Sequence, residues 1–291
     1  MAASPDTHHL RCIFSRLAPE FGAEDFFHGE IRGRLLERLP LFRLDPDVIV
    51  DLGCGCGAAL AALEETFPGR RTLGIDSAFG MALETKTGNG AAVCSDATQL
   101  PLADNSVDLV FSNLALHYTD QLGNALAEVS RVLRPGGLFI FSVAGNQSFI
   151  ELKEAWQDLP GAPQFDPLPE LQPLGDALLG SGLSDPVLDS EALTVTYESP
   201  DKLLQELRAV TATRLTSRRH KGLTGKALWS KMRAACDAAR NDAGVIPVSV
   251  EVVYGHAFGG NKGPAAVTEH PGEQSVPLSQ LLGRKGKKSP G

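Results

Sequence analysis

The stretch VIVDLGCGCG, residues 48–57, decides the fold. Val48, Ile49 and Val50 form a short β-branched run, which favours a buried strand, and three alternating glycines follow it. An alanine- and leucine-rich segment then continues to Glu65 and predicts a helix. Glycines in a strand-to-helix turn let backbone amides approach a ligand, and the next helix offers its positive N-terminus. We therefore expect a strand–turn–helix unit whose turn binds a small molecule.

The same alternation of short apolar runs and helical segments continues on the C-terminal side of this unit. A helix is expected over 122–134, because Pro135-Gly136-Gly137 is a helix stop. Further strands are expected at 72–75, 91–94, 107–112, 138–143, 187–197 and 249–258. Strands that alternate with helices predict a parallel sheet with helices on both faces. The predicted fold class is therefore α/β, a Rossmann-like, seven-stranded and mostly parallel sheet.

The chain divides into three predicted parts. Residues 1–45 form an N-terminal helical cap, with two amphipathic helices over 7–39. Residues 46–260 form the α/β domain, and a helical lid insert occupies about 198–248. Gly, Pro, Lys and Ser dominate residues 261–291, which predicts a flexible basic tail.

Composition narrows the class of protein. The 291 residues are 43% hydrophobic and 21% charged, which is typical of a soluble globular protein with a substantial core. No stretch reaches the roughly 18 apolar residues of a membrane span. Five cysteines without a CxxC pair argue against a disulfide framework and favour a reducing cytoplasm. Cys54 and Cys56 lack further nearby ligands, so no metal site is expected.

Three aspartates stand at the predicted strand ends. Asp51 precedes the glycine turn, and Asp76 ends the second strand 19 residues after Gly57. An acid at that position accepts hydrogen bonds from ribose hydroxyls. Asp96 ends the third strand, where an acid can hold an exocyclic amine. The pattern predicts a nucleoside-containing ligand, while NAD binding, no ligand, or an N-cap role for Asp96 stay open as alternatives.

At this point the sequence resembles the class I S-adenosylmethionine-dependent methyltransferases. The resemblance rests on VIVDLGCGCG, LGID, CSDATQLPLADNSVDLVFSNLALHY and EVSRVLRPGG, between residues 48 and 143. It implies that S-adenosylmethionine is the cofactor, that Gly53, Gly55 and Gly57 line its methionine part, and that Asp51 is a further cofactor-binding residue. It further implies ribose binding by Asp76, adenine binding by Asp96 and Ala97, and a methyl-proximal border formed by Asn113 and Leu114.

Other segments resemble the malonyl-acyl-carrier-protein O-methyltransferase family of biotin synthesis. They are IFSRLAPEF, IELKEAWQDL, GLTG and SVEVVYGHAFG, so the similarity extends from about residue 10 to 260. It implies methyl transfer to the free carboxylate of malonyl-acyl carrier protein, giving the ester that primes pimeloyl formation. Phe21 stands where the family usually has Tyr, and residues 209–213 replace a Gly-Ala-rich element. A methyltransferase for a small molecule such as a quinone precursor, and a non-catalytic assembly factor, are the alternatives.

The reaction implied by this resemblance needs no general base. A malonyl carboxylate is already ionised at pH 7 and can accept a methyl group directly. His117 and Tyr118, after the fourth predicted strand, are candidates to orient that carboxylate by hydrogen bonds. The alternative for both is a packing or capping role at the strand end.

A basic segment stands out from an acidic chain of net charge -8. Residues 208–233 hold eight Lys or Arg and no Asp or Glu. By the family resemblance the partner is an acidic acyl carrier protein with a malonyl-phosphopantetheine arm, and the predicted docking residues are Arg214, Arg218, Arg219, Lys221 and Lys226. A solvated loop or RNA contact are the alternatives. RNA binding would add stacking aromatics, and only Trp229 lies nearby, so neither a nucleic acid nor a membrane is expected as a partner.

Overall fold

The N-terminal part of the chain is helical. The computed structural model describes residues 7–21, 26–88, 90–160, 167–204 and 225–260. Two helices, α1 (Thr7–Phe21) and α2 (Phe26–Leu36), and a short 3-10 turn, η2 (Leu39–Leu41), precede the first strand. The two helices predicted over residues 7–39 are thus confirmed.

The described strands form one seven-stranded sheet in the order β3-β2-β1-β4-β5-β7-β6. β1 to β5 pair in parallel, and β7 runs antiparallel to both of its neighbours, β5 and β6. The predicted fold class is therefore confirmed. The strands are β1 (Val48–Leu52), β2 (Arg71–Asp76), β3 (Ala92–Cys94), β4 (Val107–Asn113), β5 (Leu133–Ala144), β6 (Leu183–Tyr197) and β7 (Ile246–Gly259).

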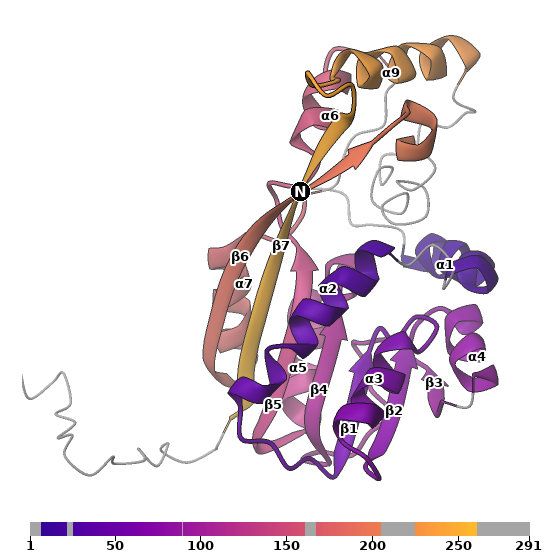
Figure 1. Cartoon of the computed structure of the whole chain (residues 1–291). Helices are drawn as coiled ribbons and strands as arrows, with labels where there is room; N and C mark the ends of the chain where they lie inside the picture. The colour runs from indigo at the N-terminus through magenta and orange to yellow at the C-terminus, as the bar shows by residue number, and fades with distance from the viewer. Residues whose placement is uncertain (1–6, 22–25, 89, 161–166, 205–224, 261–291) are drawn as a thin grey trace, which may run out of the picture. The chain divides into compact units, whose positions relative to one another are not determined.

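Helices cover both faces of the sheet (Figure 1). Successive strand residues point to opposite faces, so Ile49 packs in the core on one side and Val50 in the core on the other. This double burial explains why the parallel strands are continuous apolar runs. One face is covered by α2 and α3 (Ala58–Thr66), and the other by α5 (Leu122–Val132) and α7 (Leu171–Gly180).

The boundary between α5 and β5 differs from the prediction. The helix ends at Val132, and the strand begins at once with Leu133. Val107 pairs with Leu133, but the next pair in the ladder is Leu109 with Leu138. The Pro-Gly-Gly segment therefore bulges out of the ladder inside β5, because the extra residues have no partners on β4.

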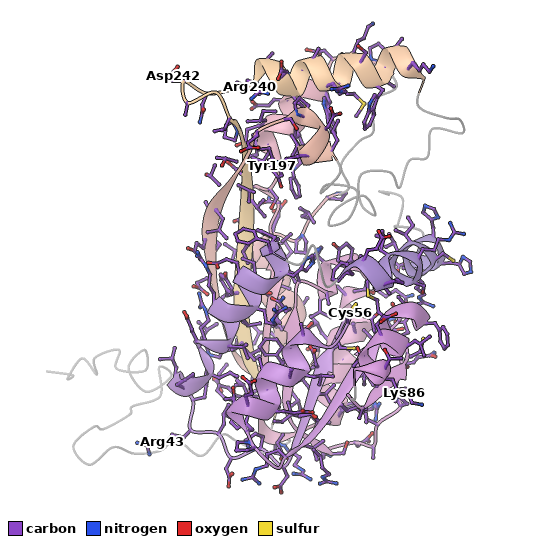
Figure 2. The ribbon with its side chains drawn as sticks, turned by 45° about the vertical axis from the view of Figure 1, so that its right-hand side comes forward. Arg43, Cys56, Lys86, Tyr197, Arg240 and Asp242 are labelled. Carbon is purple, nitrogen blue, oxygen red and sulfur yellow. The ribbon has the colours of Figure 1, made fainter. Side chains whose placement is uncertain are left out.

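The last two strands are longer than predicted. The β5–β7 pairing ends at Ala144 and Val252, whereas the β6–β7 pairing continues to Tyr197 and Ile246. Figure 2 labels Tyr197 at the end of this two-stranded ribbon. Against it pack α6 (Ile150–Trp156) and α9 (Lys226–Ala238), which share the core of one sheet face. The predicted domain bounds stay a prediction, since residues 205–224 of the insert and the tail, 261–291, lie outside the described residues.

Candidate active site

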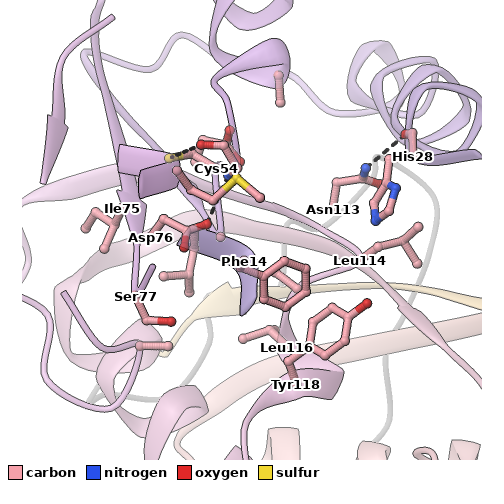
Figure 3. Close-up of a pocket in the computed structure, with 18 of the residues that line it drawn as sticks. Phe14, His28, Cys54, Ile75, Asp76, Ser77, Asn113, Leu114, Leu116 and Tyr118 are labelled. Atoms are coloured by element: carbon pink, nitrogen blue, oxygen red, sulfur yellow. Dashed lines mark hydrogen bonds between the residues drawn. The ribbon is translucent and has the colours of Figure 1, made fainter. Parts of the chain in front are cut away.

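The strand order creates a crevice beside β1. Its neighbours are β2 on one side and β4 on the other, so the loops after β1 and β4 leave the sheet in opposite directions. A cavity of about 570 Å³ lies there, a volume suited to a small ligand (Figure 3). It is lined from the carboxyl ends of β1, β2 and β4, from the segment after β3, and from α1 and α2.

The glycine turn is held tightly against two other segments. Gly53, Gly55 and Gly57 all have positive φ, at 78°, 53° and 84°. A Cβ on Gly53 would lie 2.1 Å from the Cβ of Ala115, in the segment after β4. The hydroxyl of Thr85, on α4 (Phe79–Thr87), donates to the Gly55 carbonyl at 2.9 Å. Gly53 and Gly55 line the cavity, whereas Gly57 lies at the start of α3 and is not a lining residue.

Asp76 ends β2 and lines the cavity. Its Oδ1 accepts a hydrogen bond from the Ala78 amide at 2.8 Å, and its Oδ2 accepts one from the Gly55 amide at 3.0 Å. Burial raises the pKa of Asp76 to about 6, against the lowering effect of these two amides. The carboxylate therefore joins the β1 and β2 turns and keeps lone pairs for a ligand.

Asp51 lies within β1, because the strand runs one residue beyond the predicted end. It is 1% exposed and lines the cavity, and its Oδ2 has no hydrogen-bond partner among the described residues. Burial first, and then the charge of Asp76, raise the pKa of Asp51 to about 7, while the charge of Arg32 lowers it. A buried carboxylate oxygen without a donor is costly, so this oxygen is a natural site for a ligand's donor group.

Asp96 is expected from the sequence to end the third strand, but β3 ends at Cys94 and Asp96 lies in the segment after it. Its Oδ1 accepts from the backbone amide and the hydroxyl of Thr98, both at 2.9 Å, and its Oδ2 pairs with Arg11 of α1. No helix begins at Ala97, so the N-cap alternative is wrong and Asp96 instead stabilises a turn. Both Asp96 and Ala97 line the cavity.

The end of β4 is fixed by side-chain hydrogen bonds. The Asn113 amide donates to the backbone carbonyl of His28 on α2 at 3.1 Å, and its Oδ1 accepts from the Ser142 hydroxyl at 2.9 Å. Leu114 has a positive φ of 49°, and its amide bonds to the carbonyl and the hydroxyl of Ser142, each at 3.0 Å. Both Asn113 and Leu114 line the cavity, held in place by these contacts.

The structure separates the two candidates for substrate orientation. Both lie on η3 (Leu116–Tyr118), and their rings are 4.2 Å apart. Tyr118 lines the cavity, and its ring meets that of Phe14 edge-on at 5.1 Å. His117 is 6% exposed and is not among the lining residues. Tyr118 is therefore placed to contact a ligand, whereas His117 packs behind it.

Sequence reasoning missed the contribution of the first two helices. Their apolar spacing indicated only a packed face, and the spacing could not show which strand ends they cover. α1 packs closely on α4, where a Cβ on Gly80 would lie 2.3 Å from the Ser15 carbonyl oxygen. The lining residues from these helices are Thr7, Leu10, Arg11, Phe14, Phe21, Phe26, His28 and Arg32.

The cysteine pair of the glycine turn has a packing role. Cys54 is buried, and burial raises the pKa of its thiol far above the ordinary value. The Cys56 thiol donates to the Ala18 carbonyl at 3.3 Å. The part of the chain that the structure describes holds no group of three potential metal ligands, and none of its helices is long and apolar enough to span a membrane.

Only one predicted docking residue lies within the described part of the chain. Lys226 is exposed at the start of α9. The other four, Arg214, Arg218, Arg219 and Lys221, lie outside the described residues.

Comparison with solved structures supports the fold. The chain aligns with YcgJ of Bacillus subtilis at a TM-score of 0.58 and 16% identity, covering 80% of this chain and 99% of that one. A Haloferax volcanii chain solved in complex with a methyltransferase activator aligns at a TM-score of 0.57 and 19% identity, covering 88% and 99%. These likenesses show the Rossmann-like fold.

Comparison of sequences identifies the family. Residues 50–141 match the model of a methyltransferase domain. Several curated relatives carry the name malonyl-[acyl-carrier protein] O-methyltransferase. The one from Gallionella capsiferriformans is 35% identical over 87% of this chain and 91% of its own length, and the one from Xylella fastidiosa is 34% identical over 95% and 96%. The chain therefore belongs to the malonyl-[acyl-carrier protein] O-methyltransferase family, within the class I S-adenosylmethionine-dependent methyltransferases.

Proposed function

We propose that this protein transfers a methyl group from S-adenosylmethionine to the free carboxylate of a malonyl group on acyl carrier protein. The product is the methyl ester that primes pimeloyl formation in biotin synthesis. The observation that carries the proposal is the cavity beside β1, where acids at or just after the carboxyl ends of three neighbouring strands converge in a member of this family.

The residues that line the cavity fit S-adenosylmethionine. The methionine ammonium would supply the donor that the buried Oδ2 of Asp51 lacks within the described structure. The ribose hydroxyls would donate to the remaining lone pairs of Asp76, and the adenine amine would face Asp96 and Ala97. Gly53 lies too close to Ala115 for any residue with a Cβ, so this position of the turn requires glycine.

Catalysis here is alignment and exclusion of water. Bound S-adenosylmethionine supplies an electrophilic methyl group on its sulfonium. The acceptor carboxylate is ionised at neutral pH, so no side chain has to remove a proton. The chain orients the acceptor and keeps water away with apolar lining residues such as Leu114 and Phe14, and Ser142 fixes the backbone of Leu114. Such alignment lowers the activation free energy, because the translational and rotational entropy of bringing the reactants together is lost on binding, before the chemical step.

We also propose that the basic segment docks the carrier. Acyl carrier proteins are acidic, and basic side chains on this protein would steer their approach. Lys226, exposed at the start of α9, is the described member of this set. All five cysteines are free thiols, which supports a reducing, cytoplasmic setting for the reaction.

The decisive experiment combines purified protein, malonyl-acyl carrier protein and methyl-labelled S-adenosylmethionine. Mass spectrometry of the carrier should show one added methyl group that alkali removes as an ester. Acetyl-acyl carrier protein and the carrier that already bears the methyl ester are the controls, and neither should gain label. Equal labelling of the acetyl carrier would refute methylation of the malonyl carboxylate.

Docking has its own test. Lys226→Glu, and the triple reversal of Arg218, Arg219 and Lys221 to Glu, should raise KM for malonyl-acyl carrier protein several-fold. Salt should slow the wild type at low substrate, because the Debye length falls from about 30 Å at 0.01 M to about 10 Å at 0.1 M. Lys86→Glu, a reversal of an exposed lysine on α4, is the matched control (Figure 2). Salt titrations that superimpose for all four proteins would remove docking from this segment.

A further inference from the structure

The wall of the cavity that α2 forms carries two basic side chains, His28 and Arg32. They are four residues apart, so they share one face of the helix. We propose that His28 binds the carboxylate of the methyl acceptor and orients it for transfer. The inference rests on the proposed function and goes beyond it by naming the residue that recognises the acceptor.

The first argument compares charges in the cavity. Among the described residues that line it, the aspartates, which follow β3 or lie on β1 and β2, suit the hydrogen-bond donors of the cofactor. The cofactor itself has one anionic group, the methionine carboxylate. A malonyl acceptor adds a second carboxylate, so the site has to accommodate two anions. Arg11, His28 and Arg32 are the basic lining residues that could do so.

Two of these three residues lie toward the groups proposed to hold the cofactor. Arg11 pairs with Asp96 at the proposed adenine end. Arg32 lies near enough to Asp51 for its charge to lower the pKa of that acid. Because Asp51 is the proposed partner of the methionine ammonium, Arg32 is placed for the methionine carboxylate beside it. His28 is the basic lining residue that lies beside Asn113, at the proposed methyl-transfer end of the cavity.

The position of His28 agrees with this assignment. Its backbone carbonyl accepts from Asn113 at 3.1 Å, which anchors the first turn of α2 at the carboxyl end of β4. Its ring packs against that of Phe21, with centroids 5.2 Å apart. Figure 3 shows His28 on the same side of the cavity as Asn113 and Leu114, the residues expected beside the transferred methyl group.

An imidazole N–H suits this task. It can donate to one carboxylate oxygen and leave the other free to react. That second oxygen forms the bond to the methyl carbon, the bond from carbon to sulfur breaks, and its electron pair stays on sulfur. No proton moves, so His28 acts by holding the acceptor in line.

The test compares His28→Ala and His28→Gln with Glu30→Gln, a control at an exposed position of α2 outside the lining set. His28→Ala should lower kcat/KM for malonyl-acyl carrier protein about 10- to 100-fold, the range for a hydrogen bond to a charged group. Its affinity for S-adenosylmethionine, measured by calorimetry, should stay within about threefold of the wild type. His28→Gln keeps an N–H donor and should recover most of the loss, while Glu30→Gln should behave as the wild type does.

A measurement of acceptor binding, made without turnover, tests this inference separately from the proposed function. Malonyl-pantetheine should bind the wild type in the presence of S-adenosylhomocysteine and bind His28→Ala about 10-fold more weakly. If the wild type binds it through His28 but forms no ester, the function fails and the assignment stands. Unchanged kcat/KM and binding in His28→Ala would overturn the assignment. So would a fall in S-adenosylmethionine affinity that matches the fall in kcat/KM, since that would show a structural role.

Discussion

Replacing Asp51 by Asn should raise the stability of the ligand-free protein and lower its affinity for the cofactor. The side chain is fully buried, and one of its oxygens has no partner within the described structure. Asn has nearly the same shape but carries no charge. The substitution therefore removes the cost of a buried charge while also removing the proposed partner of the methionine ammonium.

The size of the stability change follows from the pKa of Asp51, which rises from 3.8 to about 7 on folding. The folded protein thus keeps a proton that the unfolded chain has lost, so its stability falls as pH rises from about 4 to 7. At about 1.4 kcal/mol per pH unit, the ionised form costs the fold about 4 kcal/mol above pH 7. The buried Asn amide would also lack a hydrogen-bond partner, which would destabilise the variant by about 1–3 kcal/mol and offset part of this gain. The net gain of about 1–3 kcal/mol predicts a Tm rise between about 2 and 10 °C at pH 8.5.

Calorimetric scans at pH 8.5 and pH 5 would check the stability. At pH 5 the folded wild type is protonated at Asp51, the penalty shrinks to about 2 kcal/mol, and the advantage of the variant should vanish. Titration with S-adenosylmethionine at pH 8.5 should show an affinity loss of roughly 10- to 100-fold, the scale of a hydrogen bond to a charged group. A variant that is less stable than the wild type at both pH values, by the same amount, would refute the buried-charge reasoning.

Three further substitutions probe the cofactor site. Asp76→Ala should weaken S-adenosylmethionine binding by about 1.5–3 kcal/mol in calorimetry, and an unchanged affinity in a folded variant would contradict its role. Gly53→Ala should lower the free energy of unfolding by about 1–3 kcal/mol in urea, because its Cβ would meet Ala115. Gly69 has a similar φ of 76°, but a Cβ there would have no atom within 4 Å, so Gly69→Ala should lower the free energy of unfolding by less. Thr85→Val removes a hydrogen bond to the glycine turn and should weaken cofactor binding about three- to tenfold, whereas Thr85→Ser, which keeps the hydroxyl, should bind nearly normally.

The sequence by itself determined the class of fold and the set of acids at the strand ends of the site. A β-branched run followed by spaced glycines can form little except a strand that turns into a helix. Parallel strands end at one edge of their sheet, so acids after successive strands have to meet there. That is why Asp51, Asp76 and Asp96 could be predicted to lie together, although β1 runs one residue beyond Asp51 and Asp96 lies after the end of β3.

Only the tertiary structure decided which helices and side chains cover those strand ends. The contact of Arg11 with Asp96 joins residues 85 positions apart, and that of Asn113 with the His28 carbonyl spans the same separation. No local pattern encodes such pairs, because they depend on how closely two helices approach the strand ends. Tyr118 lines the cavity and His117 does not for the same reason, since the direction of each side chain is set by a short turn packed against α1. Local propensity fixes which elements form, but long-range packing fixes which of their side chains reach the ligand.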